Sequence, residues 1–91
     1  MKNTTNIQQS SSDNKFSQYV ELARELAGKA TELAGQSSFL GRMLNDVINH
    51  FRACEQADCE FTAYRECLAT EEWYNKIEGL KTGRLKISDL I

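Results

Sequence analysis

The stretch 38–69, SFLGRMLNDVINHFRACEQADCEFTAYRECLA, decides the fold class of this chain. Its apolar residues recur at steps of three and four: Leu40, Met43, Leu44, Val47, Ile48, Phe51, Cys54, Ala57, Phe61, Tyr64 and Leu68. This spacing is typical of one face of an α-helix. The chain has no proline, and no glycine lies between Gly41 and Gly79, so no strong helix breaker occurs there. The sequence therefore predicts a long amphipathic helix over about 38–69.

A second amphipathic helix is predicted upstream, over about 14–34, starting near the capping residue Asp13. Its apolar stripe consists of Phe16, Tyr19, Val20, Ala23, Leu26, Ala27, Ala30, Leu33 and Ala34. The four alanines make this stripe rich in small side chains. Gly35 can end this helix, and Ser37 or Ser38 can cap the next one. Because the connection is so short, we expect the two helices to form an antiparallel hairpin.

Two places can divide the helical region that follows. In the segment 55–60 the only residue of the apolar stripe is the small Ala57. Thr70 and the two glutamates after it, in contrast, are typical of a helix start. We favour the break at Thr70, which predicts a third helix over about 71–80 that ends before Gly83. The C-terminal extension 84–91 fits either a docking strand or a short helical turn capped by Ser88.

The predicted fold class is all-α: an antiparallel amphipathic helical hairpin plus a third short helix, assembling into an oligomeric helical bundle. The helix over 38–69 would be more than about 40 Å long, against about 30 Å for the helix over 14–34. Its first half is also apolar over more than about 100° of arc. We therefore expect a homo-oligomer, most simply a two-fold dimer. The candidate interface residues are Met43, Leu44, Val47, Ile48 and Phe51.

Composition bounds the organisation of the chain. Residues 1–12 are almost all polar, so we expect a disordered tail followed by a single helical domain over 13–91. The formal net charge of −2, with both signs interspersed, gives no attraction to nucleic acid or anionic membrane. No apolar run is long enough to span a bilayer, and no export signal is evident.

The three cysteines, Cys54, Cys59 and Cys67, are odd in number and contain no C-x-x-C pair. They cannot form a closed intramolecular disulfide framework. We interpret them as reduced thiols in a cytoplasmic protein.

His50, Cys54 and Asp58 are spaced four residues apart and would share one helix face, which suits a metal ligand set or a His–Cys dyad. A structural zinc site needs a fourth ligand, and a dyad needs an orienting group and oxyanion donors. The sequence offers none of these at the right places. We therefore expect no enzyme, no metal and no cofactor.

Two short stretches resemble known families. Residues 34–38 and 41–46 resemble the helix-turn-helix of lac-repressor-type regulators, with one residue fewer in the second helix. That resemblance implies DNA binding through Ser37, Ser38, Arg42, Asn45 and Asn49. Residues 39–41 and 74–78 resemble the turn motif and the export signal of secreted helical-hairpin dimers, which implies a dimeric exported protein.

Four aromatic residues lie beyond the reach of the helix over 14–34, and aromatics left uncovered by their own chain mark contact surfaces. The candidate partner-binding residues are Phe61, Tyr64, Trp73 and Tyr74. The alternative is that the third helix folds back and buries them. The leading function is a non-enzymatic binding or regulatory protein that contacts another protein, and its small size suggests a bacterial or phage inhibitor. The alternatives are a helix-turn-helix DNA-binding regulator and an oligomeric small-ligand-binding protein.

Overall fold

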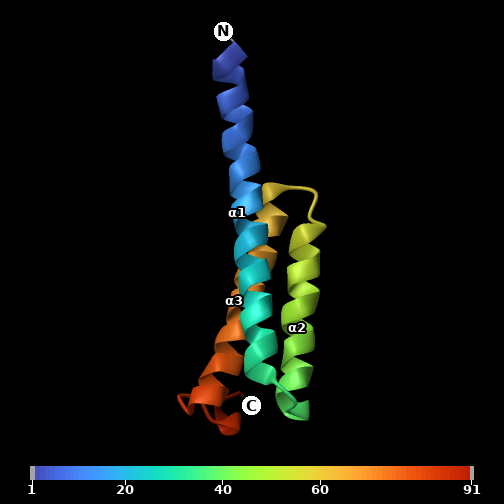
Figure 1. Ribbon diagram of the computed structural model, residues 1–91, viewed down its shortest axis with the longest axis vertical. Coiled ribbons are helices and arrows are strands. Elements are labelled where there is room, and N and C mark those ends of the chain that lie inside the picture. Colours follow the sequence, from blue (N-terminus) through green and yellow to red (C-terminus); the bar gives the residue numbers. More distant parts are fainter. Residues whose placement is uncertain (1, 91) are drawn as a thin grey trace.

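The computed structural model describes residues 2–90, with side chains described for 15–90. It contains three α-helices, α1 (Lys2–Ala34), α2 (Ser38–Glu55) and α3 (Glu60–Thr82), followed by the short 3₁₀ helix η1 (Ile87–Leu90) (Figure 1). No strand occurs in residues 2–90, which confirms the predicted all-α class. None of the described helices is long and apolar enough to cross a membrane.

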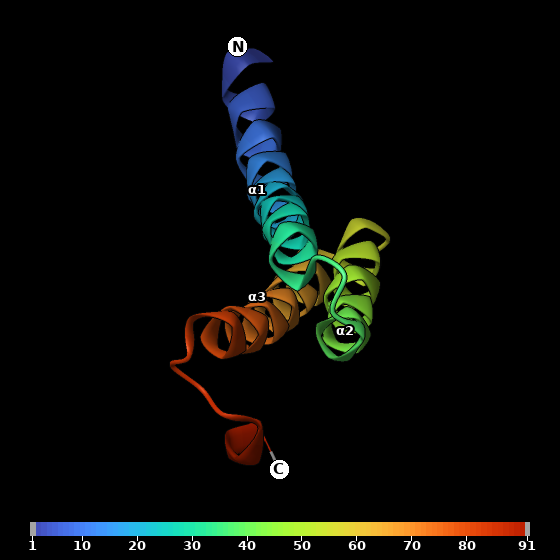
Figure 2. The ribbon, with the colours of Figure 1, turned by 60° about the horizontal axis from the view of Figure 1, so that its bottom comes forward.

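The three long helices pack along one another, and each contacts the other two. The chain reverses direction after α1 and again after α2, so α1 and α3 run in the same direction (Figures 1 and 2). The molecule measures 57 × 22 × 21 Å, and its length comes from α1, whose first turns project beyond the loop joining α2 to α3 (Figure 1).

The turn between α1 and α2 follows the local sequence signals. Gly35 has a positive φ of 52°, a conformation that glycine adopts without steric cost. Ser37 is the N-cap of α2, and its hydroxyl oxygen accepts a hydrogen bond of 3.1 Å from the Leu40 backbone N–H. Both predicted roles are confirmed.

The predicted break at Thr70 is wrong, because α2 ends at Glu55 and α3 begins at Glu60. Thr70 lies fully buried inside α3, and its hydroxyl donates to the Glu66 carbonyl at 2.8 Å instead of capping a helix. The reversal at 55–60 lets α3 fold back along α2. The predicted helix over 71–80 is therefore the second half of α3.

The core consists of two clusters. The turn-end cluster, beside the α1–α2 turn, is formed by all three helices: Ala27, Ala30, Ala34, Leu40, Met43, Val47 and Ile77. The loop-end cluster, beside the α2–α3 loop, contains Ala23, Cys54, Ala63 and Cys67. Phe51 packs against both clusters and joins them. The small side chains of α1 allow the other two helices to approach it closely.

The residues predicted to form an oligomer interface lie in this intramolecular core. Met43 and Val47 are buried in the turn-end cluster, and Leu44, Ile48 and Phe51 are half-buried against it. The interface was inferred because one helix could not cover this surface, and α3 supplies that cover within the same chain. Self-association stays a prediction, but these five residues no longer require it.

The C-terminal segment folds back over the end of α3. Gly83 ends α3 with a φ of 85°, and the Leu85 backbone N–H donates to the Gly79 carbonyl at 2.9 Å. Of the two alternatives left open for residues 84–91, the structure contains the short helical turn, η1, and not a strand. The Asp89 carboxylate, in the first turn of η1, accepts a hydrogen bond from the Lys86 backbone N–H at 2.8 Å, and Ser88, the predicted cap, lies inside η1. Leu90 packs against the turn-end cluster.

Helix α1 begins at Lys2, so the predicted start near Asp13 is wrong. Residue 1 lies outside the described residues, and the side chains of residues 2–12 are not described. The predicted disorder of residues 1–12 is therefore not tested. That disorder stays a prediction about the chain in solution.

Deletion of residues 1–12 is expected to leave Tm within about 2 °C of its original value, because a polar segment that projects beyond the bundle contributes little apolar burial. Differential scanning calorimetry of both chains measures this. A loss of several degrees would show that the segment docks on the bundle.

Candidate protein-binding surface

The four predicted partner-binding aromatics do not form one surface. Phe61 is 66% exposed and Tyr64 43% exposed, near the start of α3. Trp73 and Tyr74 are half-buried and pack against the turn-end cluster, as the alternative of a folded-back helix predicted. The Lys76 ammonium lies 4.3 Å from the centre of the Trp73 ring and covers it further. Only the first two aromatics therefore remain as candidate contact residues.

Phe61 and Tyr64 belong to an apolar strip that runs along α3 and α1. Leu68 continues the face of α3 at a further step of four residues and is 41% exposed. On α1, the Tyr19 ring lies 5.4 Å from the Tyr64 ring, and Leu22, one turn further on, is 42% exposed. We call these five residues, Tyr19, Leu22, Phe61, Tyr64 and Leu68, the α1–α3 strip.

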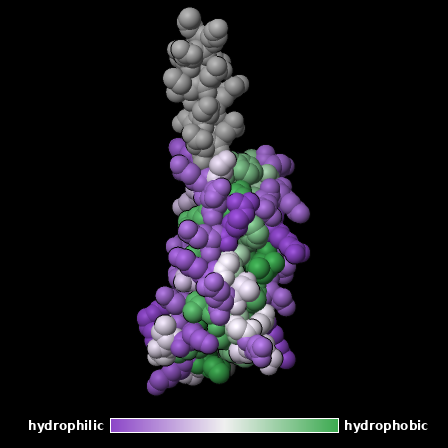
Figure 3. All heavy atoms as spheres, in the orientation of Figure 1, coloured by the Kyte–Doolittle hydropathy of each residue, from purple (hydrophilic) through white to green (hydrophobic). Residues whose placement is uncertain are grey.

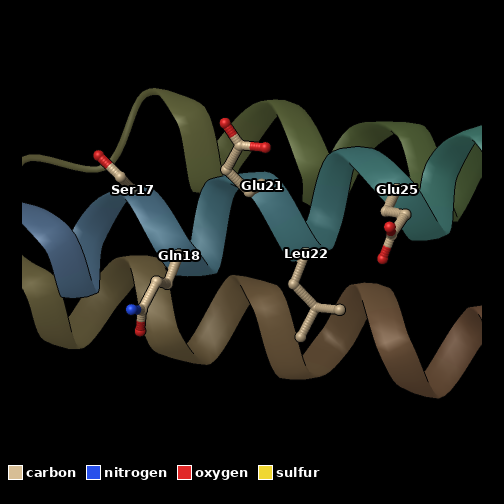
Figure 4. A pocket seen from close by; sticks show the side chains of 5 residues that line it. All are labelled: Ser17, Gln18, Glu21, Leu22 and Glu25. Atoms are coloured by element: carbon tan, nitrogen blue, oxygen red, sulfur yellow. The ribbon is translucent and has the colours of Figure 1, made fainter.

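The geometry of the strip follows from the helices that carry it. Phe61 is the second residue of α3, which begins directly after the extended N-cap residue Cys59. Figure 4 shows the Leu22 side chain extending from α1 toward α3, together with Gln18 one turn earlier. Tyr19, Phe61 and Tyr64, with Glu60, line a shallow hollow of about 380 Å³.

Charged side chains border the strip. The Arg65 guanidinium lies 5.9 Å from the centre of the Phe61 ring. Glu21 and Glu25 line the α1 side, in a hollow of about 370 Å³ built from that helix alone (Figure 4). The face of the molecule seen in Figure 3 is mostly hydrophilic, with smaller apolar areas between the charged side chains.

Sequence reasoning missed Leu22 and misassigned Leu68. Leu22 lies outside the apolar stripe of its helix, and a large apolar side chain off the stripe is the signal that was available. Leu68 was placed on a buried stripe, because the helix was taken as continuous from 38 to 69. Because α3 is a separate helix that folds back along α2, Leu68 faces outward.

A second exposed apolar area lies at the other end of the bundle. Phe39 and Ile87 are more than one-third exposed, and they border a shallow hollow of about 370 Å³. Its remaining lining residues are Leu40, Leu80, Lys81 and Leu85. This area surrounds the folded-back C-terminal segment of the same chain.

Two of the three residues considered for metal binding or catalysis, His50 and Cys54, make contacts between helices. His50 Nδ1 lies 2.6 Å from Glu66 Oε1, a hydrogen-bonded link from α2 to α3. The Cys54 thiol donates to the Ala63 carbonyl at 3.3 Å. Asp58 lies exposed in the loop between these helices. Within the described residues, no group of three side chains is arranged to hold a metal ion.

The three free thiols occupy two kinds of environment. Cys54 and Cys67 are buried in the loop-end cluster. Burial raises the pKa of Cys54 to about 11 and also raises the pKa of Cys67. Cys59 is exposed, and hydrogen bonding with Thr62, whose hydroxyl lies 3.2 Å from Sγ, lowers the pKa of this thiol.

Thiol labelling of the folded protein is expected to modify Cys59 rapidly and the two buried cysteines only after unfolding, because the thiolate is the reactive form. At about pH 8, mass spectrometry should find one modified thiol per folded chain and three in denaturant. The raised pKa of Cys54 also predicts that stability falls as pH rises from 9.0 to about 11, because the unfolded thiol ionises first. Equal labelling of all three thiols in the folded state would contradict this account.

The stretches that resemble known families have other roles in this fold. Ser37 is an N-cap, and Arg42, Asn45 and Asn49 are exposed on α2, which lies alongside α1 (Figures 1 and 2). In a helix-turn-helix the two helices cross at about 90–120°. The stretch 39–41 lies inside α2 and not in the turn, and 74–78 lies inside α3.

Comparisons with protein-family models, curated proteins and solved structures gave no match. Function is therefore inferred from the residues and their arrangement alone.

Proposed function

We propose that this protein is a non-enzymatic helical binding protein that acts by contact with protein through the α1–α3 strip. The observation that supports this proposal is the exposure of Leu22, Phe61, Tyr64 and Leu68, each 41–66% accessible on neighbouring helices. Clustered exposed apolar side chains with a polar surround mark interaction sites. Aromatic residues dominate the energetics of such contacts.

The chemistry of the remaining surface favours a binding role over the other classes. His50 and Cys54, the residues best suited to catalysis, make contacts that hold α2 to α3. The hollows described above are shallow, whereas a small-ligand site buries most of its ligand. The net charge of −2 disfavours binding to nucleic acid.

A small protein that contacts its partner through one face acts by masking a surface of that partner or by recruiting it. On this proposal the protein is regulatory, and the role of a bacterial or phage inhibitor rests on its small size alone. The exposed aromatic side chains would be the binding anchors, because a large rigid ring buries much area at little cost in conformational entropy.

Site-specific photo-cross-linking in the native host tests this proposal. A photoreactive amino acid at Leu68 is expected to give a discrete protein adduct, and the same group at Asn49, exposed on α2, is expected to give none. The adduct from position 68 should disappear when Phe61 and Tyr64 are both replaced by serine. Equal adducts from both positions, or an adduct that survives the serine replacements, would contradict the proposal.

A further inference from the structure

We infer that the α1–α3 strip binds a second copy of this chain, in an antiparallel two-fold dimer that pairs Arg65 of each copy with Glu72 of the other. This inference rests on the proposed function, because it takes the strip as a protein-contact surface and names the protein that it contacts.

The positions of three residues on α3 carry the inference. Leu68 is the last strip residue on α3 and is exposed, with Arg65 three residues before it and Glu72 four residues after it. Arg65 and Glu72 are seven residues apart, about two helical turns or about 10 Å along the axis. Viewed around the helix circumference, both therefore flank Leu68 on the same side. Both are exposed, and neither takes part in an ion pair among the described residues.

A two-fold axis beside Leu68 converts this pattern into charge complementarity. In an antiparallel arrangement, Arg65 of one copy lies opposite Glu72 of the other, and the axis repeats the pair. The two Leu68 side chains meet at the axis. A parallel arrangement would instead oppose arginine to arginine and glutamate to glutamate, which is repulsive. The charges therefore select the antiparallel dimer.

The size of the face suits a dimer that exchanges with monomer. Residues 60–75 of α3 rise about 24 Å, and the bundle is 22 × 21 Å across. The projected area of such a face is on the order of 500 Å², and its accessible surface area is larger because the surface is not flat. This area is comparable to that buried per partner in the smaller specific interfaces, about 600 Å². We expect a concentration-dependent dimer and not a permanent one.

Sedimentation velocity of the purified chain tests this inference with charge reversals. Between about 1 µM and about 1 mM, where weak dimers dissociate, the mass should rise from 10.3 kDa toward twice that value. Arg65→Glu and Glu72→Arg should each weaken the dimer by at least about tenfold, because each places like charges opposite one another. The double variant R65E/E72R should dimerise like the original chain.

An equimolar mixture of the two single variants should form a heterodimer. The chain with Arg65→Glu carries a glutamate at both positions, and the chain with Glu72→Arg carries an arginine at both, so every facing pair is again of opposite charge. Arg42→Glu, an exposed reversal on α2, is the matched control and should leave the dimer unchanged. Circular dichroism of each variant is the control that checks whether it is folded.

Three results would overturn the inference: a chain that stays monomeric to about 1 mM, a dimer indifferent to Arg65→Glu, or a double variant that fails to dimerise. These failures are distinguishable from failure of the proposed function. A monomeric chain that still cross-links from position 68 to a different protein would retain the binding role and exclude self-recognition.

Discussion

Val47→Glu is expected to leave the chain unfolded at room temperature. Val47 is fully buried in the turn-end cluster, to which all three helices contribute. A buried carboxylate without a partner costs several kcal/mol, against a total free energy of unfolding of about 5–15 kcal/mol for an ordinary domain. Loss of the helical signal in far-UV circular dichroism is the measurement.

Ile48→Glu is the matched control, because Ile48 is the next residue of α2 and is only half-buried. Its carboxylate can reach water at the edge of the bundle, so we expect a folded chain with a lower Tm. Similar behaviour of the two variants would contradict the described packing of α2 against α1 and α3.

Ala30→Leu is expected to destabilise the fold by about 1–3 kcal/mol, because the added atoms must force the helices apart. Ala30 is fully buried on the face of α1 that packs in the turn-end cluster. Urea denaturation followed by circular dichroism measures the loss as a lower midpoint.

Gly28→Ala is the control on the same helix. Gly28 is exposed, and an added Cβ there meets no atom within 4 Å. Because alanine favours helix over glycine, this variant should gain up to about 1 kcal/mol. If Ala30→Leu were as stable as the original chain, the close contact of α1 with the other helices would be refuted.

The helices and the first turn could be predicted from the sequence because their signals are local. Period-3.6 stripes marked α1 from residue 14 to its end at Ala34 and the start of α2 at Ser38, and Gly35 with Ser37 marked the turn between them. Gly35 and Ser37 act through the backbone of their own few residues, and the stripes are spacings along the chain, so neither signal required knowledge of which helix packs on which.

The second reversal could not be predicted in the same way. The segment 55–60 contains no glycine or proline, and its N-cap residue, Cys59, makes no side-chain capping bond. Thr70 offered a better local signal, yet its hydroxyl bonds to its own helix. The free energy gained when α3 packs on α2 decides the position of the break. That free energy comes from contacts between helices, which the local sequence of the loop does not specify.

The same error limited the prediction of the candidate surface. Phe61 and Tyr64 were identified from their aromatic character alone. Trp73 and Tyr74 were grouped with them because no cover was expected, and their half-burial depends on how α3 folds back. The contribution of Leu22 depends on the neighbouring position of α1 and α3, which no local pattern specifies.

Hydroxyl-radical labelling of the purified chain, read residue by residue by mass spectrometry, tests most directly whether the α1–α3 strip is the contact surface. As protein concentration rises, oxidation of Phe61, Tyr64 and Leu68 should fall, while oxidation of Phe39 and Ile87 at the other end of the bundle should stay constant. The two sets have similar exposure in a single chain, so each serves as a reference for the other. Protection of Phe39 and Ile87 with continued oxidation of the strip would contradict the account.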